Sequence, residues 1–315
     1  MEVGMKEAME RKEQYRILCE TEGDHIPLFL QYWWMDTVCQ GKHWDVALAY
    51  ASDGSIAAAM PYLIGSKLGL RYVVQPQLTQ YNGPWYRPGA DIEGATRQLA
   101  THLSALRLAL FCQNFAPSDN TPDGWATYEA SPRVTYRIDD ISDPQQVFSQ
   151  FDKRRRQRQI RQAEAILRRC DLSATEFAAF HTQYWQSRGQ KDLLTPDFMQ
   201  RTINAALRRN QGLLIGLKDH QGTLHAARFV AYDSQCAYAL LSALNPEGHA
   251  NGASALLFWH IIQQLSSTTR CFDFEGSMVP SIAYSYRLYG ARPTTYYRHF
   301  RCPIPFLRTY LRKKT

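Results

Sequence analysis

Two stretches of the chain share one pattern, in which an apolar run, a short polar turn and a second apolar run follow one another. Residues 43–64 turn at Asp53-Gly54, and residues 212–233 turn between Asp219 and Gly222. Turns of this composition between apolar runs are typical of β-hairpins. Each hairpin follows a helix-like segment that contains Gln-Tyr-Trp. The repeated order of elements indicates a duplicated domain.

The second half continues with alternating strands and helices, which predicts an α/β protein with a mixed sheet. A short helix before the last strand carries Ile282, Tyr286 and Tyr289 on one stripe. The other expected elements are a strand at 236–244, a loop at 245–254, a helix at 254–265, and strands at 270–275 and 294–302.

An arginine-rich helix is expected at residues 151–170, which hold eight of the 36 basic residues. Apolar side chains at positions 160, 163 and 167 form one stripe, and Arg154, Arg158, Arg161 and Arg168 form another. This concentration of positive charge favours an anionic partner, although a solvated surface is the common alternative.

The length of 315 residues favours two domains over a single hydrophobic core. Turn residues cluster at 142–144, so the expected domains are 1–143 and 144–315. The arginine-rich helix then opens the second domain or links the two.

Composition narrows the function classes. The seven cysteines are scattered and include no C-x-x-C pair, so neither a disulfide framework nor a zinc cluster is expected. The absence of H-E-x-x-H, phosphate-loop and G-x-S-x-G motifs disfavours metalloproteases, nucleotide hydrolases and serine hydrolases. No apolar run reaches the ~20 residues of a membrane-spanning helix, and we expect a cytoplasmic protein.

Two carboxylates alternate with two phenylalanines in the segment CFDFEGSM, residues 271–278. Because Phe272 and Phe274 are core residues by composition, Asp273 and Glu275 are expected on the opposite face, toward a cleft. Glu275 is the candidate general base and Asp273 a substrate contact. The alternative is an exposed or salt-bridged pair at a strand end.

Three further groups carry candidate chemistry, each with a structural alternative. The 245–254 loop can present amides to a phosphate, or it is a plain loop in which Ser254 caps the next helix. Tyr286 and Tyr289 are candidate proton donors or core aromatics. Substrate contacts are expected from Tyr81, Asn82, Trp85, Arg158, Arg161 and Arg287, and cofactor contacts from Gly248, Asn251, Gly252 and Ala253. Alternatively, residues 75–85 form an ordinary buttressed turn and the stem of Arg287 only covers the surface.

The order of these motifs resembles the FemAB-like branch of the GNAT acyltransferase superfamily. The resemblance is carried by LTQYNGPW after the first hairpin, by RQRQIRQAEA, and by FDFEGSM followed by YRLYGA. It implies two tandem GNAT-like domains and acyl or aminoacyl transfer to an amine, without a metal. The coenzyme A pyrophosphate loop of the family then falls on residues 248–253. Pro246-Glu247 stands where the family usually has Arg or Gln, and Arg287 stands at the lysine position of the Phe-Lys-x-x-Phe-Gly segment.

The resulting expectation is an N-acyltransferase that uses acyl-CoA or acetyl-CoA. Its acceptor is a small-molecule amine, or a sugar- or peptide-linked one, bound between the two domains. Glu275 serves as base and Tyr286 or Tyr289 as acid. The alternatives are an aminoacyl-tRNA-dependent Fem-type peptidyltransferase, with tRNA as partner, and a non-catalytic anion-binding protein on a degenerate GNAT fold. Peripheral membrane contact and oligomeric state stay open.

Overall fold

The computed structural model describes residues 2–117, 123–276 and 278–312. The chain forms two compact units: unit 1 comprises residues 1–133 and 295–315, and unit 2 comprises residues 134–294. A simple division at residue 143 therefore does not describe the grouping, because the C-terminal segment packs with the N-terminal part of the chain. The arginine-rich segment lies inside unit 2.

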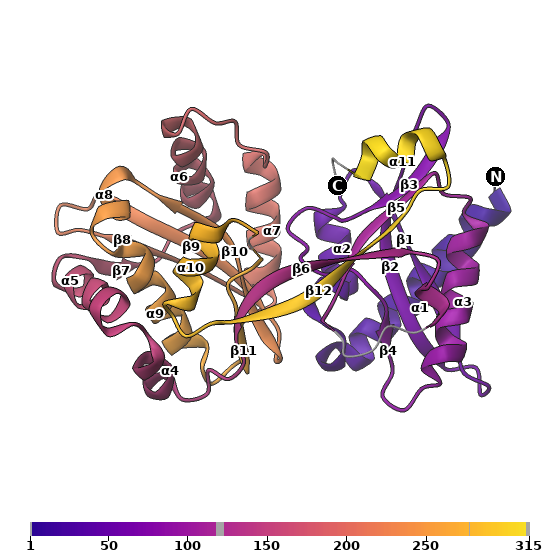
Figure 1. Ribbon diagram of the computed structural model, residues 1–315, viewed down its shortest axis with the longest axis horizontal. Helices are drawn as coiled ribbons and strands as arrows, with labels where there is room; N and C mark the ends of the chain where they lie inside the picture. The colour runs from indigo at the N-terminus through magenta and orange to yellow at the C-terminus, as the bar shows by residue number, and fades with distance from the viewer. Residues whose placement is uncertain (1, 118–122, 277, 313–315) are drawn as a thin grey trace. The chain divides into compact units, whose positions relative to one another are not determined.

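Unit 1 is a mixed sheet in the order β1-β2-β3-β5-β12, with β4 paired to β2 (Figure 1). Only β3 and β5 run parallel among these pairs. Its elements are α1 (Glu2–Glu22), η1 (Gly23–His25), η2 (Leu28–Leu30), α2 (Tyr32–Val38), β1 (His43–Tyr50), β2 (Ile56–Lys67), β3 (Leu70–Val74), β4 (Trp85–Tyr86), α3 (Ile92–Ala105), β5 (Leu110–Phe115), η3 (Asp123–Trp125), β12 (Arg292–Arg301) and α11 (Pro305–Arg312).

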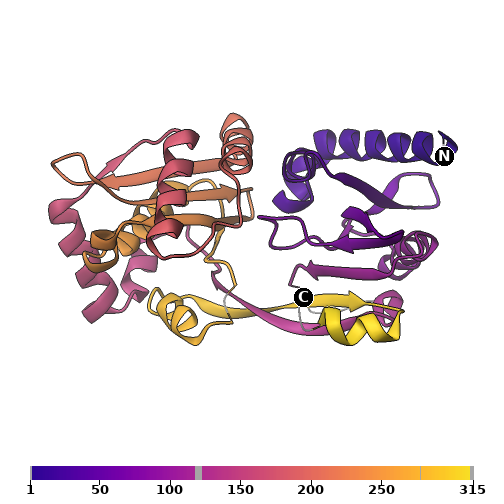
Figure 2. The same cartoon turned by 90° about the horizontal axis from the view of Figure 1, so that it is seen from above.

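The core of unit 1 lies between the sheet and α3. Asp91 caps α3 by accepting a hydrogen bond from the Gly94 amide, and Leu99 and Leu103 of this helix are buried against the sheet. In Figure 2, α1 lies beside β1, and β12 lies at the opposite side of the sheet.

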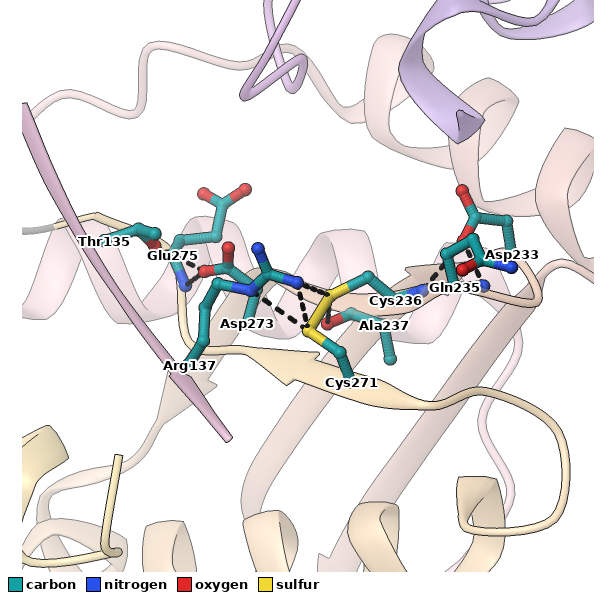
Figure 3. The surroundings of a disulfide bond; sticks show 9 residues. All are labelled: Thr135, Arg137, Asp233, Gln235, Cys236, Ala237, Cys271, Asp273 and Glu275. Carbon is teal, nitrogen blue, oxygen red and sulfur yellow. Dashed lines mark hydrogen bonds between the residues drawn. A yellow bond between two sulfur atoms is a disulfide. The ribbon is translucent and has the colours of Figure 1, made fainter. Parts of the chain in front are cut away.

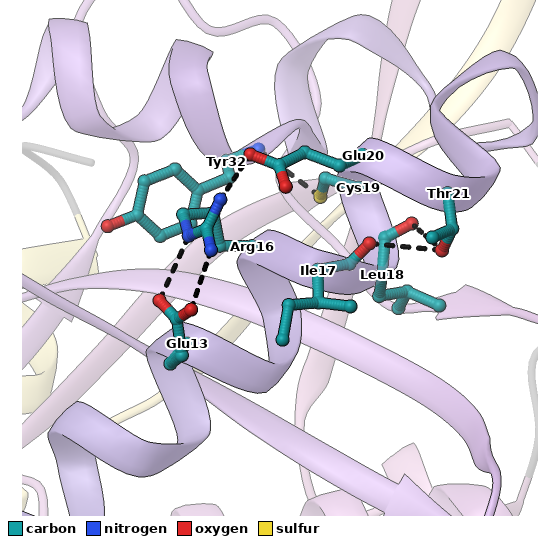
Figure 4. Close-up of polar contacts among 8 residues, drawn as sticks. All are labelled: Glu13, Arg16, Ile17, Leu18, Cys19, Glu20, Thr21 and Tyr32. Atoms are coloured by element: carbon teal, nitrogen blue, oxygen red, sulfur yellow. Dashed lines mark hydrogen bonds and ion pairs between the residues drawn. The ribbon is translucent and has the colours of Figure 1, made fainter.

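Helix α1 is tied together by side-chain contacts at its exposed surface. Arg16 donates to both carboxylate oxygens of Glu13 and also to Glu20 (Figure 4). The helix is joined to α2 where the Tyr32 amide donates to the Cys19 sulfur over 3.3 Å. These pairs at spacings of three and four residues support a helix that has little apolar periodicity.

The strands of unit 2 are both parallel and antiparallel, in the order β6-β11-β10-β9-β8-β7. Its one parallel pair among the described strands is β10 with β11. The elements are β6 (Glu129–Ile138), α4 (Pro144–Gln150), the π-helical turn η4 (Lys153–Gln157), α5 (Arg158–Ile166), β7 (Arg168–Cys170), α6 (Ala174–Ser187), α7 (Pro196–Arg208), β8 (Gly212–Lys218), β9 (Leu224–Tyr232), β10 (Cys236–Leu244), α8 (Pro246–Ala250), α9 (Ala253–Leu265), β11 (Cys271–Asp273) and α10 (Pro280–Arg287).

The two units repeat one topology. In each, a hairpin is followed by a third antiparallel strand, a helix and a strand parallel to the third, namely β1-β2-β3, α3, β5 and β8-β9-β10, α9, β11. Both predicted hairpins are confirmed, and the chain turns at the predicted positions. The internal repeat suggested by the sequence is therefore a repeat of structure.

Each sheet is completed by a strand from the other half of the sequence. In unit 1, residues 297–301 of β12 pair antiparallel with β5. In unit 2, Arg137 and Ile138 of β6 pair antiparallel with β11. The pairing of β12 with β5 explains why unit 1 combines two separate segments of the chain.

Strands β10 and β11 pair over only three residues, from Cys236 opposite Cys271 to Tyr238 opposite Asp273. Strand β10 continues to Leu244, and an extra residue between Tyr238 and Leu241 shifts its register with β9. Among the described residues, the second half of β10 thus has no strand partner on the side of β11. Such a parting of parallel strands opens a place for a ligand at the sheet edge.

Helix α9 covers one face of this sheet and buries the largest apolar cluster described for unit 2. Its side chains pack with alternate residues of β8 and β9, and α5 lies beside it (Figure 1). The predicted stripe of Ile160, Ala163 and Leu167 is buried as expected. Helices α6 and α7 pack with β10 and β8.

Phe272 is fully buried between β11 and α9, where it contacts the rings of Phe258 and Phe274. We expect Phe272→Ala to lower the free energy of unfolding by about 3–5 kcal/mol, because it removes the ring and leaves a cavity. Urea denaturation measures this change. Phe306→Ala, at an exposed position of α11, is the control and should change stability by less than about 0.5 kcal/mol. Equal effects of the two would contradict this account of the core.

Candidate functional site

The acidic pair lies where β11 ends. The strand was expected to reach residue 275, but it stops at Asp273, and Glu275 adopts a left-handed conformation with φ of 68°. Phe272 and Phe274 are buried as predicted. Asp273 does not face an open cleft, because its side chain is fully buried. A left-handed non-glycine residue beside buried acids is a strained arrangement of the kind found at functional sites.

Asp273 is held by its neighbours. The Thr135 hydroxyl on β6 donates to Asp273 Oδ1, and the Glu275 amide donates to the same oxygen over 2.8 Å (Figure 3). The second bond closes a tight turn that brings the Glu275 side chain next to Asp273. The two carboxyl groups therefore share one environment.

Glu275 is largely buried, and its pKa lies well above the usual value. Burial is the main cause, and the charge of Asp273 adds to it. A raised pKa means that the carboxyl group keeps its proton to a higher pH than an ordinary glutamate does. This behaviour suits a group that accepts and returns a proton during a reaction.

Tyr286 lies beside the acids and Tyr289 lies deeper. Tyr286, at the end of α10, is partly buried, and its pKa is raised by burial, lowered by the charge of Arg228 and raised by Glu275 and Asp273. Tyr289 is buried among aromatic rings, with the Arg156 guanidinium 4.5 Å from its centroid, and burial raises its pKa to about 12.

The proposed stripe on α10 is only partly correct. Ile282 is 40% exposed, so it does not share the environment of the two tyrosines. Tyr286, which interacts electrostatically with both acids and is only partly buried, is the better placed of the two for proton transfer.

The expected cofactor loop is partly helical. Residues Pro246–Ala250 form α8, and the Asn245 side chain caps it by accepting from the Gly248 amide over 2.7 Å. The Ala253 amide donates to Asn251 Oδ1, and Gly252, with φ of 82°, is the N-cap residue of α9 in place of Ser254.

Two backbone amides at the start of α9 do not take part in the capping hydrogen bonds. Within the described part of the chain, the Gly252 and Ser254 amides have no hydrogen-bond acceptor. A side chain at position 252 would meet the backbone oxygen of Gln159 at 2.7 Å, so only glycine lets α9 begin this close to α5. The helix dipole and these amides favour an anion at this point.

The arginines of the 151–170 segment divide into two kinds. Arg158 and Arg161 are exposed on α5. Arg156, in η4, turns inward and donates to the backbone and hydroxyl oxygens of Ser285. On α10, Arg287 is exposed and lies 5.7 Å from the Tyr136 ring centroid.

The first-half candidates are engaged inside unit 1. Tyr81, Asn82 and Trp85 are all buried. Gln113 donates to Asn82 Oδ1, and the Trp85 indole donates to the His25 carbonyl over 3.0 Å. Their contacts are those of a buttressed turn, the structural alternative that the sequence left open.

Unit 1 also contains a cavity of about 1110 Å³. Within its polar lining, Arg11 contacts Asp45 over 2.7 Å and the Tyr62 hydroxyl lies 2.8 Å from His102 Nε2.

Sequence reasoning missed two features near the acids. Cys236 and Cys271 form a disulfide, contrary to the expectation that no cysteines are paired, and Arg137 on β6 donates to the Cys271 sulfur over 2.8 Å (Figure 3). Arg228 is buried within β9. A lone charged residue inside the apolar run AARFVAY could have been noticed, whereas the disulfide depends on a strand register that the sequence does not reveal.

Two searches for specific site types gave negative results. No His, Cys, Asp and Glu cluster suited to a metal ion occurs among residues 2–117, 123–276 and 278–312. In the same ranges, no helix combines the length and apolar character needed to cross a bilayer.

Comparison with protein families and solved structures identifies the fold. Residues 151–284, which lie within unit 2, match the acetyltransferase (GNAT) domain model. Comparison with curated protein sequences gives no match. Several solved structures cover most of the chain at low identity, among them the following three.

The crystal structure of FemX is 11% identical in sequence and has a TM-score of 0.66, and the match covers 92% of this chain and 95% of FemX. The C-terminal domain of a putative lysylphosphatidylglycerol synthetase from Agrobacterium fabrum is 12% identical and has a TM-score of 0.58, and the match covers 93% of this chain and 92% of that domain. A tandem GNAT protein from the clavulanic acid biosynthesis pathway is 12% identical, with coverages of 92% and 94% and a TM-score of 0.54. The predicted α/β fold is confirmed, and the predicted GNAT resemblance is confirmed for residues 151–284. The likeness in fold to FemX and to the tandem GNAT protein agrees with the resemblance to the FemAB-like branch.

The raised pKa of Glu275 predicts a pH-dependent gain in stability for Glu275→Gln. Between the usual value of 4.5 and the raised value, the folded state holds a proton that the unfolded chain has released, so wild-type stability falls as pH rises. The glutamine of the variant does not titrate, so the stability of the variant does not fall with pH for this reason. We expect the stabilities to converge below about pH 4.5 and the variant to become the more stable protein as pH rises, as measured by urea denaturation. Glu164→Gln, exposed on α5, should show no growing difference.

Proposed function

We propose that unit 2 is an N-acyltransferase that transfers an acyl group, from an acyl-CoA, to an amine. The observation that carries this proposal is the acidic pair Asp273 and Glu275, held beside Tyr286 where β10 and β11 part. The proposal places the reaction in the cytoplasm, where acyl-CoA is available.

The acids and the tyrosine supply the two proton transfers that the reaction needs. The ionised Glu275 carboxylate takes a proton from the acceptor ammonium, directly or through a water, because only a neutral amine is nucleophilic. The amine then attacks the acyl carbonyl, a C–N bond forms and the C–S bond of the thioester breaks. The Tyr286 hydroxyl donates its proton to the leaving thiolate and regains one from the nitrogen, which must lose its second proton as the amide forms, while Glu275 releases its proton to solvent. Asp273, fixed by Thr135, keeps the Glu275 pKa high.

The donor proposal rests on the start of α9. The open amides of Gly252 and Ser254 and the helix dipole suit a pyrophosphate, and Arg158 and Arg161 are exposed on the neighbouring α5. Pro246 offers no amide hydrogen and Glu247 is negative, so the residues at the start of α8 do not contribute to the phosphate site. Binding there depends on α9 and α5.

An aminoacyl-tRNA donor is the second candidate, and a specific observation favours it. Arg154, Arg155, Arg158 and Arg161 are all exposed on one short segment, which matches the extended charge of a nucleic acid backbone. The chemistry at Glu275 is unchanged, except that the bond that breaks is the C–O bond of an ester.

Glu275→Gln keeps the shape of the side chain and removes the base. We expect it to slow acyl transfer to the identified amine by roughly 10²-fold or more. Wild-type activity should rise with pH as the carboxyl group ionises, and the variant should lose this dependence. Steady-state kinetics across pH measure both, with Glu164→Gln as the control. Full activity in Glu275→Gln would give the acid a structural role.

Thermal shift separates the two donors. An acyl-CoA should raise the melting temperature, since a ligand that binds the folded state stabilises it by mass action. The triple variant Arg154→Gln, Arg158→Gln and Arg161→Gln should weaken this shift. A tRNA donor predicts no shift with coenzyme A, but binding to aminoacyl-tRNA that weakens steeply with salt and is lost in the triple variant. If neither ligand binds, the protein is a non-catalytic member of the fold.

A further inference from the structure

Arg228 is a buried cation without an anionic partner. Its side chain lies in the middle of β9 and is only 6% exposed. Its Nε atom is buried and has no hydrogen-bond partner, and no ion pair involving Arg228 is found in the part of the chain that the structure describes. Arginine is almost never buried in this way unless it is paired.

The position of the guanidinium follows from the strands. Ser242 stands opposite Arg228 on β10, and its small side chain leaves room above that strand. The guanidinium carbon lies 3.8 Å from the centroid of the Phe258 ring on α9. Arg228 thus reaches from β9 toward the part of β10 that has no partner on the side of β11.

The neighbouring groups do not neutralise the charge. Burial lowers the pKa of Arg228, and the hydroxyl groups of Tyr286, Tyr289 and Tyr184 oppose this effect. An arginine nevertheless stays protonated in proteins, and tyrosine hydroxyls are neutral near pH 7. The contact with Phe258 recovers only part of the hydration that the cation has lost.

We propose that Arg228 binds a carboxylate of the acyl acceptor, so that the acceptor is an amino acid or another amine with a carboxylate a few bonds from its nitrogen. This inference rests on the proposed function. The Phe258 ring, which the Arg228 guanidinium contacts, lies 6.5 Å from the Tyr286 ring, and the Tyr286 ring lies 5.0 Å from that of Phe274, the residue before Glu275. One aromatic cluster thus links the cation to the acid, and Tyr286 also interacts electrostatically with both. A zwitterion fits this arrangement, with its amine at Glu275 and its carboxylate at Arg228.

A carboxylate suits this position better than a phosphate of the donor. One guanidinium among neutral hydroxyls balances one negative charge, and its planar pair of N–H groups matches the two oxygens of a carboxylate. The site proposed above for the phosphates of a donor is a different one. It consists of the Gly252 and Ser254 amides of α9 and the exposed arginines of α5.

The test uses the full chain and the twenty common amino acids, each compared with its own carboxamide, which keeps the amine and removes the charge. Binding is followed by thermal shift and by calorimetric titration. The variants are Arg228→Met, Arg228→Lys and the control Arg208→Met, at an exposed position at the end of α7. Acylated product is measured separately by mass spectrometry with acetyl-CoA.

We expect at least one amino acid to raise the melting temperature of the wild type while its carboxamide does not. Arg228→Met should weaken binding by roughly 10- to 100-fold, the range for a lost hydrogen-bonded charge contact, and Arg208→Met should bind as the wild type does. Arg228→Lys keeps the charge but not the paired N–H groups, so its affinity should fall between those of the wild type and Arg228→Met. It also provides the comparison if Arg228→Met does not fold.

Three outcomes would overturn the proposal: equal binding of an amino acid and its carboxamide, no binding of any amino acid, or a shift with coenzyme A that is lost in Arg228→Met, which would assign Arg228 to the donor. Amino acid binding that depends on Arg228 without acylated product would support the subsite and contradict the proposed acyltransferase. Acyl transfer at the same rate to an amino acid and to its carboxamide would support the acyltransferase and contradict the carboxylate subsite.

Discussion

Strands β10 and β11 pair for only three residues, and the groups of the candidate site take their positions from that short pairing. After Asp273 the chain stays with β6, through the bond from the Phe274 amide to the Tyr136 carbonyl, while β10 continues with β9. The left-handed Glu275 sits at this parting, and α9 begins beyond the far end of β10. A longer ladder would extend β11 past Asp273 and remove the turn that positions Glu275.

The site gathers charges that each resist burial. Glu275 beside Asp273 is unfavourable when both are ionised, and Arg228 is unfavourable while it has no counterion. The surrounding aromatic cluster of Phe258, Phe272 and Phe274 is firmly packed and holds these groups in place. Such tension between local electrostatics and the rest of the fold is characteristic of binding and catalytic sites, where the missing partner is the ligand.

The spacing of apolar residues along the chain predicted most of the fold. The hairpins, β10 and the buried stripe of α5 follow from the spacing of apolar residues and from turn composition, which act over a few positions. The features that were wrong or missed depend on distant partners. The burial of Asp273 requires Thr135 from β6, the disulfide requires the register of β10 with β11, and α8 forms because Asn245 caps it. The candidate acids were found from alternation alone, whereas Arg228 became a candidate only once its neighbours on α9 and α10 were known.

The pairing of β5 with the distant β12 also bears on the order in which the protein is made. A ribosome releases β5 long before β12, and contacts between them, such as the bond from Arg298 to Asn114, join residues 184 positions apart. Until β12 has been synthesised, the nascent unit 1 therefore presents β5 as an unpaired edge, a surface that invites pairing with other chains. Native assembly of unit 1 must wait for β12, so a chain that stops before Arg292 would keep this edge of the sheet open.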